Sequence, residues 1–466
     1  MKVTVIGIGR LGAPYAASLA EIGHDVLGVE PDPKTLGRLT SGLAPFDEPD
    51  LGATIAKHAA SGTMRFTASY DDAARFADIH FVCVPTPQTA GALAADLSYI
   101  EAAVASLAHR ARRDCLIVAK SSVPVGTMDR LATLATGAAR PGVRVSLAYS
   151  PDFLRESTSM TDAARPTRIV VGIQRERDRP DAEDVLRHVW APWLEAGVPL
   201  VVTDWATAEL SKSAANAFLA TKVSFINFLG AMCEHSGADI QALSATLALD
   251  PRIGPAMLDA GLGFGGSCIP KDIRALAERG RELDVPEAGF LRDVDAINIR
   301  RRRRVVALTR EALGGTLTGQ RIAVWGAAFK PGTDDVRDSP ALAVARELAA
   351  AGAAVAVHDP KALETVREEA PELATCDDAA AVLDGANVLL HLTHWEAYRQ
   401  TDPAALFSRI ATPVVIDARG TLDAALWTAA GWTYTALGQT PANVRAVKEA
   451  AQALTGQPAT GLEGNH

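Results

Sequence analysis

Short apolar runs rich in β-branched residues alternate with alanine-rich stretches over roughly the first 200 residues of the chain. The runs expected to form strands are 3–6, 25–29, 79–84, 116–119, 144–149 and 169–171. Between them lie stretches with helical spacing, such as 14–22 and 100–110. This alternation is typical of a parallel sheet whose strands are joined by crossover helices.

The pattern changes at about Asp204, where long helical stretches replace the alternation. These predicted helices are 206–236, 271–283 and 290–313. A second alternating part follows, with strands expected at 321–326, 354–358, 387–392 and 413–417. We therefore expect an α/β protein with two doubly wound parallel-sheet domains around a helical middle. The predicted domains are 1–203, 204–313 and 314–455, and the polar tail 456–466 is expected to be disordered.

Composition and charge narrow the class of protein. Hydrophobic residues make up 48% and charged residues 22% of the chain, as in ordinary globular proteins, and the net charge of -9 argues against general nucleic-acid binding. The N-terminus reads as a strand rather than a signal peptide, and no apolar run approaches the ~20 residues that span a bilayer. We expect a cytoplasmic protein that binds no membrane. Five consecutive arginines at 300–304 are interpreted as a solvated helix face or a helix end near a domain junction.

The cysteines indicate a reducing compartment. They are scattered and form neither a CxxC pair nor a regular spacing, which fits the cytoplasm better than a disulfide scaffold. The five are Cys83, Cys115, Cys233, Cys268 and Cys376.

A glycine pattern at the N-terminus predicts a dinucleotide site. Gly7, Gly9 and Gly12 form G-x-G-x-x-G directly after a predicted strand and at the start of a predicted helix. Amides at such a helix start point toward a pyrophosphate. Glu30 ends the next strand, where a carboxylate can accept from both ribose hydroxyls and repels a 2′-phosphate. NAD is therefore favoured over NADP.

Two later segments stand at the carboxyl ends of predicted strands, where open sheets bind ligands. They are 83–87, which reads CVPTP, and 120–127, which reads KSSVPVGT. Their hydroxyl groups either hold a ligand or a water, or merely cap a turn.

The segment 264–272 carries the most distinctive chemistry of the chain. It places Cys268 behind paired glycines and ahead of a predicted helix whose first turns carry Lys271 and Asp272. Glycines allow backbone amides to approach a ligand closely, and a helix start favours the thiolate, which is the nucleophilic form. The segment thus suits attack on a carbonyl carbon. The alternative is a cysteine that serves as a small core residue.

Two further pairs have a spacing of four residues. Lys212 and Asn216 share one face of a predicted helix, and together they could stabilise an oxyanion. The alternative is a lysine whose ammonium reaches solvent, beside an asparagine whose side chain has its hydrogen bonds satisfied. Asp152 and Glu156 form the second pair, in which a carboxylate could deprotonate a water. The alternative is that Asp152 and Glu156 are two acidic residues on the surface without a catalytic role.

These residues resemble the UDP-glucose/GDP-mannose dehydrogenase family over nearly the whole chain. The matching stretches are GIGRLG, CVPTP, DLSYI, KSSVPVGT, SPDFLRES, AELSKSAANAFLATKVSFIN, DPRIG, GFGGSCIPKD, GAAFKPGTDDVRDSP and DARG. The resemblance implies two Rossmann-like domains joined by a long central helix that forms a homodimer. It also implies NAD in the first domain and the nucleotide of a sugar nucleotide in the last.

The reaction that the resemblance implies is a four-electron oxidation of a primary alcohol to a carboxylate by two NAD in turn. Cys268 would form a thiohemiacetal and then a thioester, which water releases as the acid. Lys212 and Asn216 would hold the oxyanions. Asp272 would help to position a water or would shuttle a proton, and Ser122 would hold the same water. A covalent intermediate makes physical sense because a bound aldehyde cannot escape between the two hydride transfers.

The resemblance also implies the binding residues, and it implies no metal. The expected cofactor contacts are Gly7, Gly9, Arg10, Leu11, Gly12, Glu30, Thr35, Pro85, Thr86, Ser121, Glu156, Lys271 and Arg337. The expected substrate contacts are Asp152, Phe153, Leu154, Arg155, Lys212, Asn216, Arg252, Phe264, Gly265, Gly266, Lys330 and Arg419, of which Arg252 would reach across the dimer.

One position departs from the family pattern. The family usually has Pro-Glu-Phe-Leu where this chain has Asp152 after Pro151, so the carboxylate is one methylene shorter. A shift of ~1 Å can lower the rate of a reaction between positioned groups by about 10²-fold. Thioester hydrolysis is therefore the step that the shorter carboxylate is expected to affect. Phe228 is a smaller departure, because the family helix often has an acid there.

UDP-glucose is the substrate that the helix motif and DPRIG favour. GDP-mannose and UDP-N-acetylhexosamines remain alternatives, since one sequence does not show pocket shape. Two other classes compete with this interpretation. A two-electron hydroxyacid dehydrogenase would need no cysteine nucleophile, and a nucleotide-sugar sensor would have lost hydrolysis through the change at Asp152.

Overall fold

The computed structural model describes residues 1–174 and 181–439. The predicted tail 456–466 and the end of the third predicted domain therefore lie outside the described residues. The chain divides into two compact units. The first unit contains Met1–Phe218 and Lys271–Leu291, and the second contains Leu219–Pro270 and Arg292–His466. The helical middle, expected as one region, is thus shared between the two units.

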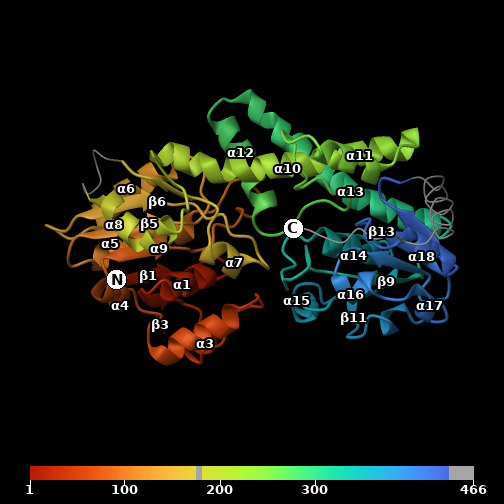
Figure 1. The fold of residues 1–466 in the computed structure, drawn as a ribbon, viewed down its shortest axis with the longest axis horizontal. Coiled ribbons are helices and arrows are strands. Elements are labelled where there is room, and N and C mark those ends of the chain that lie inside the picture. Colours follow the sequence, from red (N-terminus) through yellow and green to blue (C-terminus); the bar gives the residue numbers. More distant parts are fainter. Residues whose placement is uncertain (175–180, 440–466) are drawn as a thin grey trace. The chain divides into compact units, whose positions relative to one another are not determined.

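The first unit is built on one large sheet (Figure 1). Its strands are β1 (Lys2–Ile6), β2 (Asp25–Val29), β3 (Met64–Thr67), β4 (Ile79–Val82), β5 (Cys115–Ala119), β6 (Val145–Tyr149), β7 (Ile169–Gly172) and β8 (Leu200–Thr203). They lie in the order β3-β2-β1-β4-β5-β6-β7-β8. The described neighbours are parallel except for β6 and β7, which meet through Tyr149 and Gly172. The first six positions have the strand order of a doubly wound dinucleotide fold.

Helices connect these strands in the red-to-yellow part of Figure 1. They are α1 (Gly12–Glu21), α2 (Pro33–Thr40), α3 (Leu51–Ser61), α4 (Tyr70–Phe76), α5 (Ser98–Arg110), α6 (Thr127–Ala138), α7 (Ser159–Ala164), α8 (Ala182–Val189) and α9 (Ala191–Glu195). The first part of α10 (Trp205–Ser236), most of α12 (Ile269–Glu282) and the short η1 (Pro286–Gly289) also belong to this unit.

Both faces of this sheet are apolar, which explains the continuous hydrophobic runs of its strands. Side chains alternate between the two faces along a strand. Leu116 and Val118 of β5 join the core that contains α1, whereas Ile117 and Ala119 join the core that contains α5 and α6. Each face therefore has its own buried layer.

The second unit repeats the same sheet topology with parallel strands (Figure 1). Its strands are β9 (Arg321–Trp325), β10 (Ala354–His358), β11 (Ala374–Thr375), β12 (Val388–His391), β13 (Val414–Asp417) and β14 (Thr433–Ala436), in the order β11-β10-β9-β12-β13-β14. Its helices are α11 (Ile240–Ala248), most of α13 (Phe290–Ala312), α14 (Pro340–Ala350), α15 (Leu363–Glu369), η2 (Ala381–Leu383), α16 (Glu396–Arg399), α17 (Pro403–Leu406) and α18 (Ala424–Ala429).

Aromatic rings fill the core of the second unit. The Trp325 ring of β9 stacks on the Tyr398 ring at a centroid distance of 4.7 Å, and Trp427 meets Trp325 edge-on at 6.1 Å. All three side chains are buried. Such pairs add about 0.5–1.5 kcal/mol each beyond the area that they bury.

The predicted fold class is confirmed, and the errors concern short elements. The expected strands of both sheets form within two residues of their predicted ends, and helix 14–22 begins earlier, at Gly12. The strands β3, β8, β11 and β14 were not predicted. β11 is two residues long, and β3 is an edge strand with the mixed sequence MRFT, so neither gives a periodic signal.

The interpretation of the arginine run as a solvated face is wrong for Arg301. Its side chain is buried and pairs with Glu234 of α10 at 3.3 Å. Arg304 pairs with the other oxygen of Glu234 at 3.0 Å, and Arg302 pairs with Asp338 at 3.0 Å. These three arginines therefore connect α13 by ion pairs to α10 and to Asp338 within the second unit.

The helix α10 is long and apolar enough to cross a membrane by length and composition alone, which the sequence reading did not anticipate. Half of its most apolar stretch of 18 residues is buried inside the protein. A core helix of a water-soluble protein passes the same test, so the finding is weak evidence for a membrane span.

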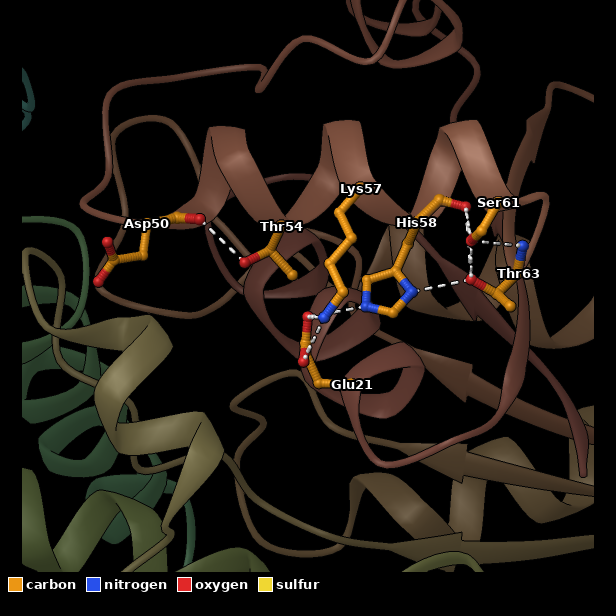
Figure 2. Close-up of polar contacts among 7 residues, drawn as sticks. All are labelled: Glu21, Asp50, Thr54, Lys57, His58, Ser61 and Thr63. Carbon is orange, nitrogen blue, oxygen red and sulfur yellow. Dashed lines mark hydrogen bonds and ion pairs between the residues drawn. The ribbon is translucent and has the colours of Figure 1, made fainter.

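A polar network on the first unit lies between α1 and α3 (Figure 2). The Glu21 carboxylate accepts from the Lys57 ammonium at 2.8 Å and lies 2.8 Å from His58 Nε2, while His58 Nδ1 lies 2.8 Å from the Thr63 hydroxyl. Lys57 and, to a smaller extent, His58 lower the pKa of Glu21. Because the Lys57 and Glu21 side chains are exposed, the pair contributes less than about 1 kcal/mol.

Candidate active site

The glycine turn after β1 has the shape that a dinucleotide needs. Gly7 has a φ of +87°, which a residue with a side chain rarely adopts, and a Cβ on Gly12 would lie 1.8 Å from the Gly7 carbonyl oxygen. A Cβ on Gly9 would meet no atom within 4 Å, so space is open beside the turn. The turn therefore leaves room for a phosphate close to the backbone at the start of α1.

Glu30 follows β2 and lies against this turn. Its Oε2 accepts from the Ile8 amide at 3.1 Å, and its Oε1 accepts from the Asp32 amide at 3.0 Å. The carboxylate thus stands beside the glycine turn, with further lone pairs available to ribose hydroxyls. The Thr35 amide donates to Asp32 at 2.7 Å, which places Thr35 in the first turn of α2.

Hydroxyl groups tie together the loops that follow β4 and β5. Thr86 donates to the Ser122 carbonyl at 2.8 Å, and Ser121 donates to the Val84 carbonyl at 2.6 Å. Both donors are buried. The Thr86 and Ser121 hydroxyls thereby brace the two loops, on either side of Pro85, and Ser122 lies half-buried in the braced segment.

The segment after β6 carries the two predicted carboxylates, but it is not a helix. The spacing of four therefore does not place Asp152 and Glu156 on one helical face. Asp152 Oδ1 accepts from the Leu154 amide at 3.1 Å, which forms a local turn, and Glu156 lies 3.8 Å from Arg10. Arg155 pairs with Asp162 at 2.6 Å.

Two cations lie near the ring of Phe153. The Arg168 guanidinium is 3.7 Å and the Lys212 ammonium 5.5 Å from the centroid of its ring. Lys212 is 6% exposed, so its ammonium is costly unless it is paired or used. The alternative interpretation, a lysine that reaches solvent, does not describe this buried side chain.

Asn216 and Lys271 both donate to the carboxylate of Asp272 in the first unit. The Asn216 side-chain amide donates to Asp272 Oδ2 at 2.6 Å, and the Lys271 ammonium donates to Asp272 Oδ1 at 2.6 Å. Asp272 is 4% exposed and Asn216 7%. The structure thus pairs Lys271, expected at the cofactor, with a carboxylate on its own helix.

Lys120 and Glu209 are two of the buried charged residues that were not predicted as site residues. Lys120 is 5% exposed, donates to the Ser150 carbonyl at 3.1 Å and lies 4.3 Å from the centroid of the Tyr15 ring. Burial lowers the pKa of Lys120, while nearby Asp152 and Cys83 oppose the shift. The sequence could have indicated Lys120, because a lysine directly follows the apolar strand β5.

Glu209 is the second of these unpredicted residues. It accepts from the Gly126 amide at 2.8 Å and from the Met128 amide at 2.7 Å, and so caps the start of α6. Burial raises the pKa of Glu209 although these amides favour its charged form. The residue holds the end of the segment that contains Ser122.

The cysteine segment belongs to the second unit up to Pro270. Cys268 is exposed and immediately precedes α12. Gly266 has a φ of +86°, and its amide donates to the Arg337 carbonyl at 3.1 Å. A Cβ on Gly265 would lie 2.5 Å from the Asp338 carbonyl oxygen. The paired glycines therefore allow close packing against the segment after β9.

Two side chains of the second unit hold the start of this segment. The Asn298 side chain accepts from the Phe264 amide at 2.8 Å and donates to the Phe264 carbonyl at 2.9 Å. Arg419 donates to the carbonyls of Leu392 at 2.7 Å, Gly263 at 3.1 Å and Phe329 at 3.3 Å. Burial lowers the pKa of Arg419 to about 10.

The other predicted residues of the second unit lie at its surface or near loops. The Arg252 side chain is 87% exposed and pairs with Asp250 at 2.6 Å. Arg337 pairs with Asp335 at 2.7 Å, and the Lys330 ammonium is 5.6 Å from the centroid of the Phe329 ring. Over residues 1–174 and 181–439, no group of His, Cys, Asp and Glu has the arrangement of a metal site.

Three models of one protein family match the chain in succession. They are the NAD binding domain of the UDP-glucose/GDP-mannose dehydrogenase family at residues 1–194, its central domain at 206–300 and its UDP binding domain at 323–424. The chain belongs to the UDP-glucose/GDP-mannose dehydrogenase family. The predicted resemblance is thereby confirmed.

Individual relatives agree with this assignment. UDP-glucose 6-dehydrogenase of Rhizobium meliloti is 38% identical over 419 residues, which are 90% of this chain and 95% of that protein. The structure of a UDP-glucose dehydrogenase from Pyrobaculum islandicum has a TM-score of 0.85 at 35% identity and covers 94% of this chain and 98% of that one. A UDP-D-ManNAc dehydrogenase from Pyrococcus horikoshii, with a TM-score of 0.82, 23% identity and coverage of 94% and 99%, shares the fold.

Membership of the family establishes the cofactor and the reaction type. The dehydrogenase uses NAD, as the glycine turn and Glu30 predicted. The chain is therefore an NAD-dependent oxidoreductase of a nucleotide-sugar dehydrogenase family.

The cysteines of the native protein should differ sharply in reactivity. Brief treatment with iodoacetamide should alkylate Cys268 first, because it is exposed, whereas Cys83, Cys115 and Cys233 are buried. Burial also raises the pKa of Cys83 to about 12, which suppresses its thiolate. Peptide mass spectrometry measures the order of modification. A first adduct on one of the buried cysteines would contradict the described exposure.

Proposed function

We propose that this enzyme oxidises the C6 hydroxymethyl group of UDP-glucose to the carboxylate of UDP-glucuronate, with two NAD reduced per sugar. The main support is the exposed Cys268 directly ahead of α12, whose first turn carries the Asp272 that Asn216 binds. Relatives with the name UDP-glucose 6-dehydrogenase match nearly the full chain. Scattered cysteines without regular spacing favour a cytoplasmic location.

In the first half of the reaction C6 loses a hydride, and Asp272 takes the proton of the C6 hydroxyl and passes it to water, which gives an aldehyde. NAD supplies the hydride acceptor in both halves. The Cys268 thiolate then adds to the aldehyde carbon, so that a C–S bond forms and the carbonyl oxygen becomes an oxyanion. Lys212 and Asn216 stabilise this oxyanion, because their buried donors favour developing negative charge.

The second half begins when the thiohemiacetal loses a hydride and becomes a thioester on Cys268. Water then attacks the carbonyl carbon, the C–S bond breaks and the thiolate is restored. Asp152 accepts the proton of this water, while Asp272 and Ser122 hold the water in place. The covalent link keeps the intermediate bound between the two hydride transfers.

In this proposal the residues predicted from the sequence hold the cofactor and the substrate. Gly7, Gly9, Arg10, Leu11, Gly12, Glu30, Thr35, Pro85, Thr86, Ser121 and Glu156 would bind NAD, with Lys271 and Arg337 near it. Phe153, Leu154, Arg155, Phe264, Gly265, Gly266, Lys330 and Arg419 would bind the nucleotide sugar. The match of the UDP binding domain at 323–424 supports the assignment of Lys330 and Arg419.

The enzyme further acts as a homodimer in this proposal, with α10 at the interface. Phe218, Phe225, Phe228 and Met232 are each 45–68% exposed on this helix. Their spacings of seven, three and four residues form the a and d seam of a heptad repeat. A second copy would bury this stripe and would bring Arg252 to the partner's substrate.

Loss of the nucleophile should stop the reaction after the aldehyde stage. Purified wild-type protein should release two NADH per sugar acid from UDP-glucose in a panel that also contains UDP-N-acetylhexosamines and GDP-mannose. The Cys268→Ser variant should lose at least about 10³-fold in acid formation. NADH absorbance and chromatography of the nucleotide sugars measure both. Undiminished acid formation by Cys268→Ser would refute the mechanism, and one NADH per freely released product would favour a hydroxyacid-type enzyme.

Lengthening the carboxylate at position 152 should accelerate hydrolysis. The Asp152→Glu variant restores the missing methylene and removes the short turn to the Leu154 amide, so the carboxylate can reach further. We expect up to about a 10²-fold faster decay of the Cys268 adduct, measured by quenched mass spectrometry. An unchanged decay rate would show that the shorter side chain does not limit the enzyme.

A charge in the exposed stripe of α10 should separate the subunits. Phe225→Glu would bury a carboxylate in the proposed seam, and light scattering should then report half the mass of the wild-type species. Phe407→Glu is the control, because Phe407 is 42% exposed and lies outside α10. Equal masses for both variants and the wild type would contradict an interface on this stripe.

A further inference from the structure

The segment 150–159 joins β6 to α7 and carries Asp152 and Glu156; we call it the carboxylate loop. Between Ser150 and Thr158 it has no helix or strand of its own. Ser157 has a φ of +68°, a conformation that costs about 1–3 kcal/mol for a residue with a side chain. Such a segment keeps one conformation only if contacts from outside determine it.

Glu48 supplies these contacts at the end of the carboxylate loop. Its Oε2 accepts from the Ser157 amide at 2.9 Å, and its Oε1 accepts from the Ser159 amide at 2.8 Å. Glu48 is 6% exposed, and it precedes its two partners by 109 and 111 residues in the chain. Both bonds are charge-assisted, and one of them fixes the residue with the unfavourable backbone conformation.

Lys120 holds the other end. Its ammonium donates to the Ser150 carbonyl at 3.1 Å, and the Ser150 amide donates to the Ala119 carbonyl at 2.9 Å. The ammonium also lies 4.3 Å from the centroid of the Tyr15 ring. The start of the loop is thereby bound to the end of β5 through two successive residues, Ala119 and Lys120.

We propose that Glu48 and Lys120 are positioning residues that hold the carboxylate loop at both ends, so that Asp152 stays where it activates the hydrolytic water. The proposal rests on the proposed function. A short carboxylate tolerates little displacement, because a shift of ~1 Å can cost about 10²-fold in a positioned reaction. Because hydrolysis depends on the reach of the short Asp152 side chain, loss of either residue should affect hydrolysis more than the two hydride transfers.

Two nearly isosteric variants test this role. Glu48→Gln turns one acceptor into a donor that faces a backbone amide, and Lys120→Met removes the donor to Ser150 while it keeps the apolar stem. The matched controls are Glu21→Gln and Lys57→Met. They remove a carboxylate and an ammonium of the same unit that bind each other between α1 and α3 (Figure 2). If Glu48→Gln fails to fold, Lys120→Met alone tests the proposal, because loss of the contact at either end of the carboxylate loop should slow hydrolysis.

The readout separates hydrolysis from hydride transfer. After wild-type enzyme is mixed with UDP-glucose and NAD, stopped-flow absorbance reports NADH, and quenched mass spectrometry reports the acyl adduct on Cys268. Both test variants should keep the rapid formation of two NADH per site and then accumulate the adduct, with hydrolysis slowed by about 10- to 100-fold. The controls should hydrolyse at the wild-type rate.

Two outcomes would overturn the inference while the proposed function stands. One is wild-type hydrolysis in both folded test variants. The other is an equal slowing of hydride transfer and hydrolysis together with a lower melting temperature, which would indicate a merely structural role. If wild-type protein itself forms no adduct and no second NADH, the proposed function fails, and the inference falls with it.

Discussion

The parallel arrangement of the first sheet is the constraint on which the rest of this unit depends. In a parallel sheet the carboxyl ends of all strands meet at one edge, and β1, β4, β5 and β6 are successive neighbours. The glycine turn, the loops after β4 and β5, and the carboxylate loop therefore leave from the same edge. The strand order alone thus brings residues that are far apart in the chain close together, independently of contacts between their side chains.

Buried charges then fix the loops that the sheet brings together. Lys120 binds the Ser150 carbonyl, Glu209 binds the Gly126 and Met128 amides, and Glu48 binds the Ser157 and Ser159 amides. A buried charge without partners would cost several kcal/mol, so each of these side chains requires the loop in one position. The same dependence makes the loops sensitive to the loss of a single charge, which exposed pairs such as Glu21 with Lys57 do not share.

The sequence predicted what is local or recognisable by residue type. The spacing of Gly7, Gly9, Gly12 and Glu30 predicts the turn that they form, and the neighbours of Cys268 predict its position directly ahead of a helix. Contacts between distant residues give no such signal. Nothing in the spacing pairs Glu48 with Ser157, Asn298 with Phe264, or Arg301 with Glu234, although each pair fixes a segment of its unit. The prediction of a solvated arginine run was wrong for Arg301 for this reason, because the burial of Arg301 depends on an acid 67 residues earlier.

Arg419 shows how the second unit limits what a predicted residue can do. A guanidinium has five N–H donors, and three are directed at the carbonyls of Leu392, Gly263 and Phe329. Two N–H groups are therefore left for any ligand that binds there while these bonds persist. Because Gly263 begins the segment that leads to Cys268, a ligand that displaced the bond to its carbonyl would also loosen that segment. A substrate contact at Arg419, as proposed, would thus be coupled to the position of the cysteine segment through one side chain.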